Sequence, residues 1–435
     1  MMKRGITYRS TRGGARGVSF REALLTGLAP DGGLFVPESI PVIPPEIPRE
    51  AADFPALAAE VLTRWLAAEV PPDRLSALSR DAFSFPVPLV PLLGKGWEGV
   101  SVLELFHGPT LSFKDFGARA MARLMGHFLE ASDERLTILV ATSGDTGSAV
   151  ADGFAGMDNI RVVLLYPKGQ VSPTQERQLI VRRPGVRSFA VAGTFDDCQR
   201  MVKAAFVDPE TAALGLSSAN SINIGRLLPQ MLYYFRAGRQ RGEEVVFSVP
   251  SGNLGNLTGG LLAALSGLPV RRFLAAHNAN DFFPNVLAGR AETPKASRRT
   301  LSNAMDVGAP SNFERITALL GPEEMQARIW GTSVADRATV ASMRRVYEET
   351  GYLADPHTAV GLEAVRRYRA ETGDATPAVV LATAHPAKFP ETVERVLGFS
   401  PETPERLAAL MHRPTNAAAL APTPAALKER LLAHV

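Results

Sequence analysis

Short runs rich in Val, Ile and Leu alternate with longer segments of helical periodicity along most of this chain. The runs predict strands at residues 136–141, 160–166, 186–191, 245–249, 273–276 and 378–383. The segments between them predict helices, among them 146–154, 195–206 and 257–265. Strands that alternate with helices favour parallel sheets covered by helices on both faces. The pattern therefore indicates an α/β fold.

The length of the chain, 435 residues, is too great for one ordinary core, so we expect two or three domains. Residues 1–92 are interpreted as an N-terminal, mostly helical unit, with helical spacing at 51–80 and a proline-rich connector at 83–93. The strand–helix alternation occupies residues 93–400. Residues 401–435 form an Ala/Pro-rich tail with one expected helix near its end.

The composition argues against several classes of protein. The net charge is only +3 and the arginine pairs are scattered, so no nucleic-acid partner is expected. Cys198 is the single cysteine, which excludes an internal disulfide framework and a cysteine zinc site; we interpret it as a small buried side chain. No metal-hydrolase or serine-hydrolase motif occurs, and no metal is expected. No apolar run is long enough for a membrane span and no secretory signal is visible, so a cytoplasmic protein without a membrane partner is expected.

Lys114 lies between Phe113 and Phe116, directly before a stretch of helical character at 117–129. A lysine amine held beside apolar surface tends to lose its proton. A neutral amine can form a Schiff base with a carbonyl cofactor such as pyridoxal phosphate. The alternative is a solvated surface lysine, which is what most lysines are. The choice depends on the other motifs of the chain.

Two glycine-containing loops each follow a predicted strand and lead into a predicted helix. The loop at 142–147 can hold a carboxylate at the helix N-terminus, or it can be a plain helix cap. The loop at 251–256 can bring several N–H groups together around a phosphate. It fits neither the Walker pattern nor the dinucleotide pattern, and a structural turn is the alternative.

Two further segments carry polar side chains at places suited to a ligand. The segment 220–226 ends in Arg226 and suits a dianionic phosphate, although a solvated strand edge is the alternative. Thr383 is the last residue of the strand predicted at 378–383, at the edge of a parallel sheet where ligands gather, and its hydroxyl can bind a ring nitrogen. His385 nearby is interpreted as a structural histidine.

Together these motifs, in this order, resemble those of the threonine synthases, pyridoxal-phosphate enzymes of fold type II, the class of the tryptophan synthase β subunit. The resemblance extends over nearly the whole chain and includes segments 17–35 and 301–307. It implies an α/β fold with two open parallel-sheet lobes and flanking helices, the smaller lobe at about 118–235, behind an N-terminal threonine-synthase-type unit. It also implies pyridoxal 5'-phosphate as the cofactor.

The resemblance assigns a role to each motif. The implied catalytic residue is Lys114, which would form the Schiff base. The implied cofactor-binding residues are Lys114, Phe113, Gly252, Asn253, Leu254, Gly255, Asn256 and Thr383. The implied substrate-binding residues are Thr142, Ser143, Gly144, Asp145, Thr146, Asn220, Ser221 and Arg226. Asn256 departs from the Asp that close relatives often carry, which puts the polarity of that one contact in question.

The implied reaction converts O-phospho-L-homoserine and water to L-threonine and phosphate, the last step of threonine biosynthesis. One alternative is a serine/threonine dehydratase-like lyase on the same scaffold, which needs no second phosphate site. Another is a non-catalytic homologue that binds a phosphorylated ligand. The expected partner is a small-molecule substrate, and the expected assembly is a monomer or a homodimer.

Overall fold

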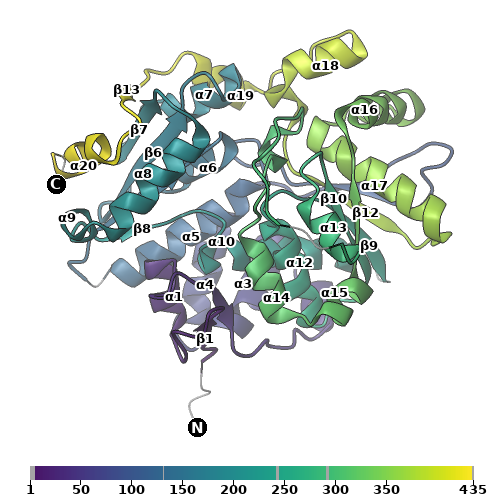
Figure 1. Cartoon of the computed structure of the whole chain (residues 1–435). Coiled ribbons are helices and arrows are strands. Elements are labelled where there is room, and N and C mark those ends of the chain that lie inside the picture. Colours follow the sequence, from purple (N-terminus) through teal and green to yellow (C-terminus); the bar gives the residue numbers. More distant parts are fainter. Residues whose placement is uncertain (1–4, 131, 242–243, 291–292, 434–435) are drawn as a thin grey trace.

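The computed structural model describes residues 5–130, 132–241, 244–290 and 293–433. Two sheet-based lobes lie side by side, and a smaller N-terminal unit lies against both of them at the bottom of Figure 1. One hydrophobic cluster continues from the N-terminal unit through α5 (Lys114–Leu129) into both lobes. The confirmed fold class is thus α/β with two open, predominantly parallel sheets.

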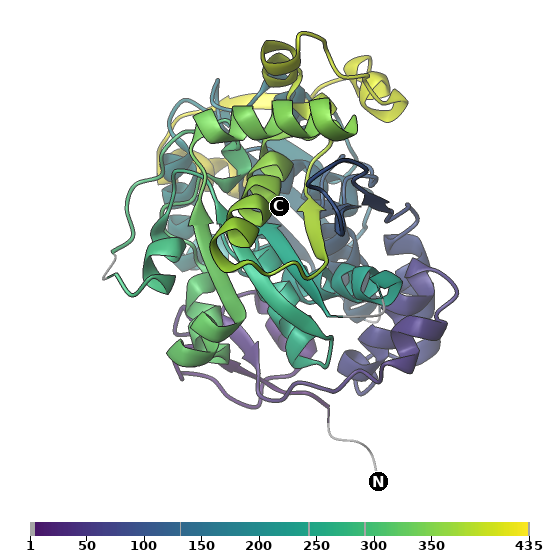
Figure 2. The same ribbon diagram turned by 90° about the vertical axis from the view of Figure 1, so that its right-hand side faces the viewer.

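The larger sheet has six strands. In spatial order they are β11 (Ile329–Ser333), β10 (Val270–His277), β9 (Val245–Pro250), β12 (Ala378–Ala382), β4 (Val100–Glu104) and β3 (Leu89–Pro91). All neighbours are parallel except β3, which is antiparallel to β4 and lies at the edge, where its proline is tolerated. The helical segments of this lobe are α12 (Gly255–Leu265), α13 (Phe282–Leu287), η2 (Asn303–Met305), α14 (Asn312–Leu319), α15 (Pro322–Arg328), α16 (Asp336–Thr350), α17 (Pro356–Thr372), η3 (Pro386–Lys388) and α18 (Pro390–Leu397). Helix α17 packs on three central strands, and Figure 2 shows α16 and α17 in light green over this face.

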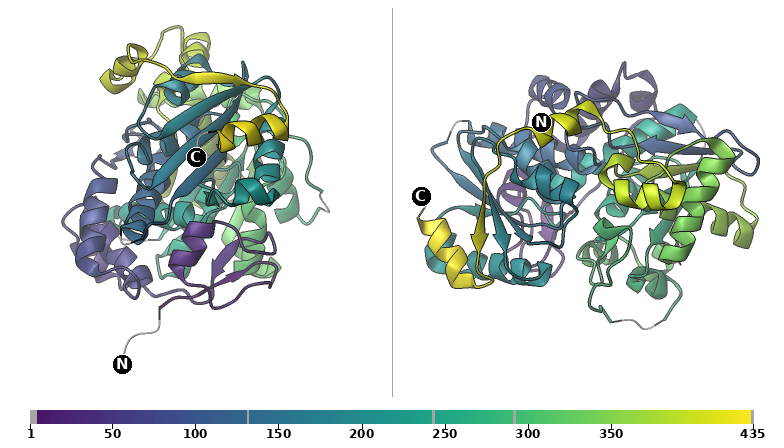
Figure 3. Two further views of the ribbon diagram at one scale, coloured as in Figure 1. Left: turned by 90° about the vertical axis from the view of Figure 1, so that its left-hand side faces the viewer. Right: turned by 90° about the horizontal axis from the view of Figure 1, so that it is seen from above.

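The smaller sheet has five parallel strands. In spatial order they are β13 (Ala417–Leu420), β7 (Val186–Val191), β6 (Ile160–Pro167), β5 (Leu136–Ala141) and β8 (Leu216–Ser217). Its helical segments, with those that join it to the larger lobe, are α5, α6 (Asp145–Gly153), α7 (Pro173–Ile180), α8 (Phe195–Val207), α9 (Pro209–Ala212), α10 (Ile224–Leu227), η1 (Leu228–Met231), α11 (Leu232–Arg241), α19 (Glu405–Met411) and α20 (Pro424–Leu432). Figure 3 shows the yellow C-terminal strand and helix along this sheet.

The N-terminal unit contains an antiparallel ribbon and four helices. They are β1 (Tyr8–Ser10), α1 (Phe20–Thr26), β2 (Phe35–Pro37), α2 (Glu46–Glu50), α3 (Phe54–Leu66) and α4 (Pro72–Ala82). Phe116 in α5 packs edge-on against Phe54 and Phe85 of this unit, with ring centroids 5.6 and 5.1 Å apart. The unit therefore fixes the first turn of the helix that begins at Lys114.

The sequence prediction missed the strands β3, β4, β8 and β11, and it also differs from the structure in the tail. We expected one helix there, and α20 is present, but α19 and β13 are present as well. Residues 417–420 read Ala-Ala-Ala-Leu and carry no β-branched residue, so local propensity gives no strand signal. The open edge of β7 imposes the extended conformation on them. The boundaries of the units at 1–92, 93–400 and 401–435 stay a prediction.

The candidate motifs gather because each follows a parallel strand. Strands β4, β9 and β12 are neighbours, and their carboxyl ends meet at one edge of the large sheet. The loops at 105–113, 251–254 and 383–385 leave from that edge. The loop at 142–144 leaves the corresponding end of β5 in the smaller lobe. In a parallel fold this edge is where ligands bind.

Candidate active site

Lys114 is the first residue of α5, and a separate part of the chain holds the loop before it. The Phe113 N–H donates to the Thr383 carbonyl at 2.9 Å, and the His385 N–H donates to the Leu111 carbonyl at 3.1 Å. An isolated antiparallel bridge joins Ser112 to the same segment. The structure therefore places Thr383 beside Lys114, although 269 residues separate them in sequence (383 − 114 = 269).

The Lys114 amine is in a partly apolar environment, as its neighbours predicted. Its side chain is half-buried, and Nζ lies 5.2 Å from the centroid of the Phe113 ring. Burial lowers the pKa of Lys114 to about 8; Asp145 raises it, and Arg226 and Lys388 lower it further. An amine with this pKa is substantially neutral at mildly alkaline pH, which suits both a nucleophile and a proton acceptor.

Asp145 lies at the start of α6 and forms a short ion pair with Lys388. Its Oδ1 is 2.6 Å from Lys388 Nζ, and Gln175 Nε2 donates to the same oxygen at 3.1 Å. Burial opposes ionisation of Asp145, but the charges of Lys388 and Lys114 outweigh it and hold the pKa at about 2. The Asp145 side chain is thus a fixed anion that is already paired.

In the rest of the loop 142–147, Thr142 stabilises the backbone of the loop, whereas the hydroxyls of Ser143 and Thr146 face no hydrogen-bond partner among the described residues. The Thr142 hydroxyl accepts from the Gly144 and Gly147 N–H groups at 3.0 and 2.9 Å, which closes the loop. Ser143 is exposed and Thr146 is half-buried. Within the described ranges neither side chain makes a hydrogen bond, so both hydroxyls are available to a ligand.

The loop 251–256 has the backbone of an anion cradle. Leu254 has a φ of 60° directly before α12, and a Cβ on Gly252 would lie 2.8 Å from the Met305 Cα. Asn256 Oδ1 accepts from the hydroxyls of Tyr233 and Tyr234 at 2.7 and 2.8 Å. These contacts fix its orientation and leave buried Nδ2 without a partner among the described residues. A free amide donor at the start of a helix fits a phosphate, so the residues present fit pyridoxal phosphate.

The loop at 220–223 lies directly against this cradle. Asn253 Nδ2 donates to Ser221 Oγ at 2.6 Å. Asn312 Nδ2 bridges the two loops by donating to the carbonyls of both residues, at 3.0 and 3.2 Å. Asn220 is half-buried, and its side chain makes no hydrogen bond to any part of the chain that the structure describes. The two proposed phosphate-binding segments are therefore adjacent.

Arg226 is buried, which excludes the solvated alternative. Its Nη1 donates to the Ala219 carbonyl at 2.6 Å, and its Nε has no partner in the described chain. Burial lowers the pKa of Arg226 to about 10, and Asp115 raises it. No carboxylate of the described residues forms an ion pair with this guanidinium, and a buried cation of this kind suits an anionic ligand.

Sequence reasoning did not select Lys388 or Gln175. Lys388 is fully buried, and Gln175 links Asp145 of the small lobe to Asn303 of the large lobe, donating to the first and accepting from the second. Lys388 lies in the segment 383–389, and a lysine within a mostly apolar stretch was the one available signal. Nothing in sequence indicates Gln175, because its role depends on the packing of α7 against α6.

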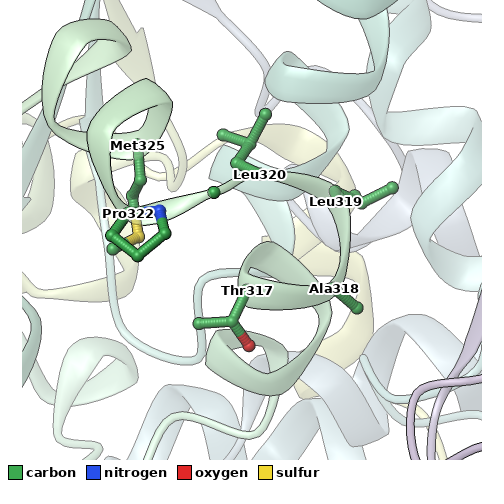
Figure 4. A pocket seen from close by; sticks show the side chains of 7 residues that line it. Thr317, Ala318, Leu319, Leu320, Pro322 and Met325 are labelled. Atoms are coloured by element: carbon green, nitrogen blue, oxygen red, sulfur yellow. The ribbon is translucent and has the colours of Figure 1, made fainter.

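Other features of the structure offer less chemistry. A hollow at the turn between α14 and α15 has Thr317 as its single polar side chain, and that hydroxyl donates to the Glu314 carbonyl (Figure 4). Among the described residues, no group of three or more His, Cys, Asp or Glu side chains could hold a metal ion. None of the helices within the described ranges combines the length and the hydrophobicity of a membrane-spanning segment.

Comparison with known proteins gives one consistent family. The model described as "Pyridoxal-phosphate dependent enzyme" matches residues 85–384, "Threonine synthase N terminus" matches 7–83, and "Threonine synthase, C-terminal" matches 358–430. The threonine synthase of Escherichia coli K12 is 44% identical over 424 residues, which cover 96% of this chain and 97% of that protein.

Solved structures agree with this result. The pyridoxal-phosphate-bound threonine synthase of Brucella melitensis has a TM-score of 0.92 and 35% identity, with 99% of each chain covered. The threonine synthase of Escherichia coli has a TM-score of 0.90 and 41% identity, with 99% of this chain and 100% of that chain covered.

Proposed function

Because the chain belongs to the threonine synthase family of pyridoxal-phosphate-dependent enzymes, we propose that its substrate is O-phospho-L-homoserine. The chain is a carbon–oxygen lyase of threonine biosynthesis with pyridoxal phosphate as its cofactor. The proposed reaction breaks the bond between Cγ and the phosphate oxygen. At Cβ one hydrogen leaves as a proton and the hydroxyl of water takes its place. Of that proton and the remaining proton of water, one is added at Cγ and the other goes to the departing phosphate, so that L-threonine and phosphate are released.

The observation that carries the substrate proposal is the buried guanidinium of Arg226. It lies close enough to Lys114 to lower the pKa of that amine, and its Nε is unpaired within the described chain. A serine/threonine dehydratase acts on substrates without phosphate and would gain nothing from this cation. A non-catalytic binding homologue would not need a lysine with a lowered pKa. Both alternatives therefore fit the site less well.

The cofactor-binding roles are proposed from the geometry and the family resemblance. Pyridoxal phosphate supplies an aldehyde that a lysine amine binds covalently and a ring that accepts electrons from the substrate carbon. Lys114 would be that lysine, with the Phe113 ring beside it. The Thr383 hydroxyl would face the ring nitrogen as a neutral partner. The phosphate would be held by the backbone of Gly252, Asn253, Leu254 and Gly255 and by Asn256 Nδ2.

The substrate-binding roles follow from the remaining polar groups. The N-terminus of α6 and the hydroxyls of Ser143 and Thr146 would hold the substrate carboxylate. Arg226, with Asn220 and Ser221, would hold the substrate phosphate. The Lys114 amine would remove the proton at Cα, act again at Cβ, and return a proton, for which a pKa near 8 is suitable.

One assay tests the proposed function. The purified protein with pyridoxal phosphate is mixed with O-phospho-L-homoserine, and phosphate and threonine are measured together. We expect the two products in equal amounts. Formation of a 2-keto acid and ammonia from serine or threonine, with no phosphate release from phosphohomoserine, would favour the dehydratase alternative. Binding without any product would favour the non-catalytic one. The expectations of a cytoplasmic location and of a monomer or homodimer stay predictions.

A further inference from the structure

Lys388 is a buried cation that joins three segments around the proposed site. It ends η3, which follows β12 in the large lobe, and its side chain is fully buried. Its Nζ forms the 2.6 Å ion pair with Asp145 in the small lobe. The same Nζ donates at 2.9 Å to the carbonyl of Thr110, in the loop that precedes Lys114.

The position of Asp145 creates an electrostatic problem for the proposed substrate. Asp145 begins α6, whose N-terminus is the proposed site for the substrate carboxylate, and its own carboxylate is buried and ionised. Two carboxylates in one poorly solvated site repel each other. The substrate carboxylate can use the N–H groups of this helix only if the charge of Asp145 is balanced. Lys388 is the cation in direct contact with it.

We infer that Lys388 is a positioning residue: its ammonium neutralises Asp145 and ties the N-terminus of α6 to the loop before Lys114, so that an α-carboxylate can bind there. The inference rests on the proposed function. In this role, Lys388 allows amino-acid substrates that carry an α-carboxylate to bind. Lys388 itself does not contact the substrate.

Lys388 also acts on the Lys114 amine. The charged groups that face this amine are Asp145 from α6, Arg226 from α10 and Lys388 from η3. Asp145 raises the pKa of Lys114, whereas the two cations lower it. Removing Lys388 should therefore raise the pKa of Lys114, and removing Asp145 should lower it. This shift can be measured on the protein without substrate.

The test compares Lys388→Met, Lys388→Arg, Asp145→Asn and the double variant Lys388→Met/Asp145→Asn. Two ligands are used: O-phospho-L-homoserine and 3-aminopropyl phosphate, which is the same molecule without the α-carboxylate. For Lys388→Met we expect KM for phosphohomoserine to rise about tenfold or more, because the charge of Asp145 is left unbalanced. The inhibition constant of 3-aminopropyl phosphate should change less than about threefold, because that ligand carries no carboxylate to repel.

The double variant separates charge balance from a direct role. If Lys388 acts by neutralising Asp145, removing both charges should bring KM most of the way back to that of the unchanged protein. Lys388→Arg keeps the positive charge, so its KM should also stay close to that of the unchanged protein. An equal loss for both ligands, or a double variant as impaired as Lys388→Met, would overturn the inference.

Two measurements keep the test decisive if Lys388→Met does not fold. In Asp145→Asn, the affinity for phosphohomoserine relative to that for 3-aminopropyl phosphate should not fall, and a fall in this ratio would contradict the inference. In the double variant, the pH midpoint of Lys114 labelling by an amine reagent should lie between the midpoints of Lys388→Arg and Asp145→Asn, since the two charge effects oppose each other and that of Asp145 is the larger. If the unchanged protein releases no phosphate from phosphohomoserine, the proposed function fails, while the labelling result still tests the effect of Lys388 on Lys114.

Discussion

At the scale of single residues, the chemistry depends on how three distant parts of the chain surround Lys114. Its neighbour Phe113 could be read from the sequence, but Asp145, Arg226 and Lys388 reach it only through the fold. The lowered pKa has its largest cause in burial, which the flanking phenylalanines predicted. Nothing in the sequence next to Lys114 indicates the three charged side chains that act on its amine.

The first prediction concerns the protonation of Lys114. Its amine should react with an amine-directed reagent with a midpoint near pH 8, because only the neutral form reacts and its folded-state pKa is about 8. Lys428 is the internal control, because hydrogen bonds to Glu210 and Asp208 raise the pKa of its amine. Mass spectrometry of competitively labelled apo-protein gives both midpoints. Equal midpoints for the two lysines would contradict the lowered pKa.

The second prediction concerns Arg226. In Arg226→Ala, KM for O-phospho-L-homoserine should rise about 10- to 100-fold, because hydrogen bonds to charged groups contribute about 1.5–3 kcal/mol. The visible absorbance of the bound cofactor should not change. Arg226→Lys keeps the charge and should show a smaller rise. An unchanged KM in the alanine variant would remove the substrate-phosphate assignment.

At the scale of elements, strand ends and helix starts place the functional groups. Helix α12 starts within the cradle at 251–256, and the hydroxyls of Tyr233 and Tyr234, both in α11, orient the Asn256 amide. The sequence indicated the cradle through its glycines. It could not indicate the tyrosines, because the hydrogen bonds join segments about twenty residues apart whose relative rotation depends on packing.

The third prediction concerns Gly252 in this cradle. A Cβ at Gly252 would meet backbone atoms, the Met305 Cα at 2.8 Å and the Ala304 carbonyl at 3.2 Å, which cannot move aside as a flexible side chain would. In Gly252→Ala, affinity for pyridoxal phosphate should fall about 5- to 100-fold, since overpacking costs about 1–3 kcal/mol. Gly321→Ala is the matched control, because a Cβ there meets nothing within 4 Å and its φ is −68°. Absorbance titration of the apo-protein measures both affinities; equal values would contradict the close packing.

At the scale of the whole molecule, the C-terminal tail completes the smaller sheet. Strand β13 pairs with β7, and Leu420, Leu427 and Leu431 are buried in the same cluster as Cys198. The chain thus returns to the small lobe after it has built the large one. The interlobe contacts of Gln175 and Lys388 depend on the same long-range arrangement.

The fourth prediction concerns the edge of β7 that β13 covers. Deletion of residues 416–435 should lower the melting temperature and promote aggregation, because it leaves the β7 edge unpaired and exposes apolar surface. Leu427→Ala is the control: it should cost about 2–5 kcal/mol of stability through lost packing, without opening the edge. Thermal unfolding and light scattering measure the two effects. A truncated chain as stable and soluble as the full one would show that the tail is dispensable.

The fold class could be predicted from local sequence patterns alone, and so could the segments that make up the candidate site. Hydrophobic runs predicted six strands of the two large sheets, glycines and polar residues after those runs predicted the loops, and the phenylalanines beside Lys114 indicated a partly apolar environment for its amine. These signals are local, so they can be recognised without knowing which segments pack against each other. Three features became known from the folded structure: Arg226 is buried, two tyrosines orient Asn256, and Lys388 pairs with Asp145. Burial and ion pairing between distant segments depend on which surfaces the packed lobes bring together, and no local pattern encodes that.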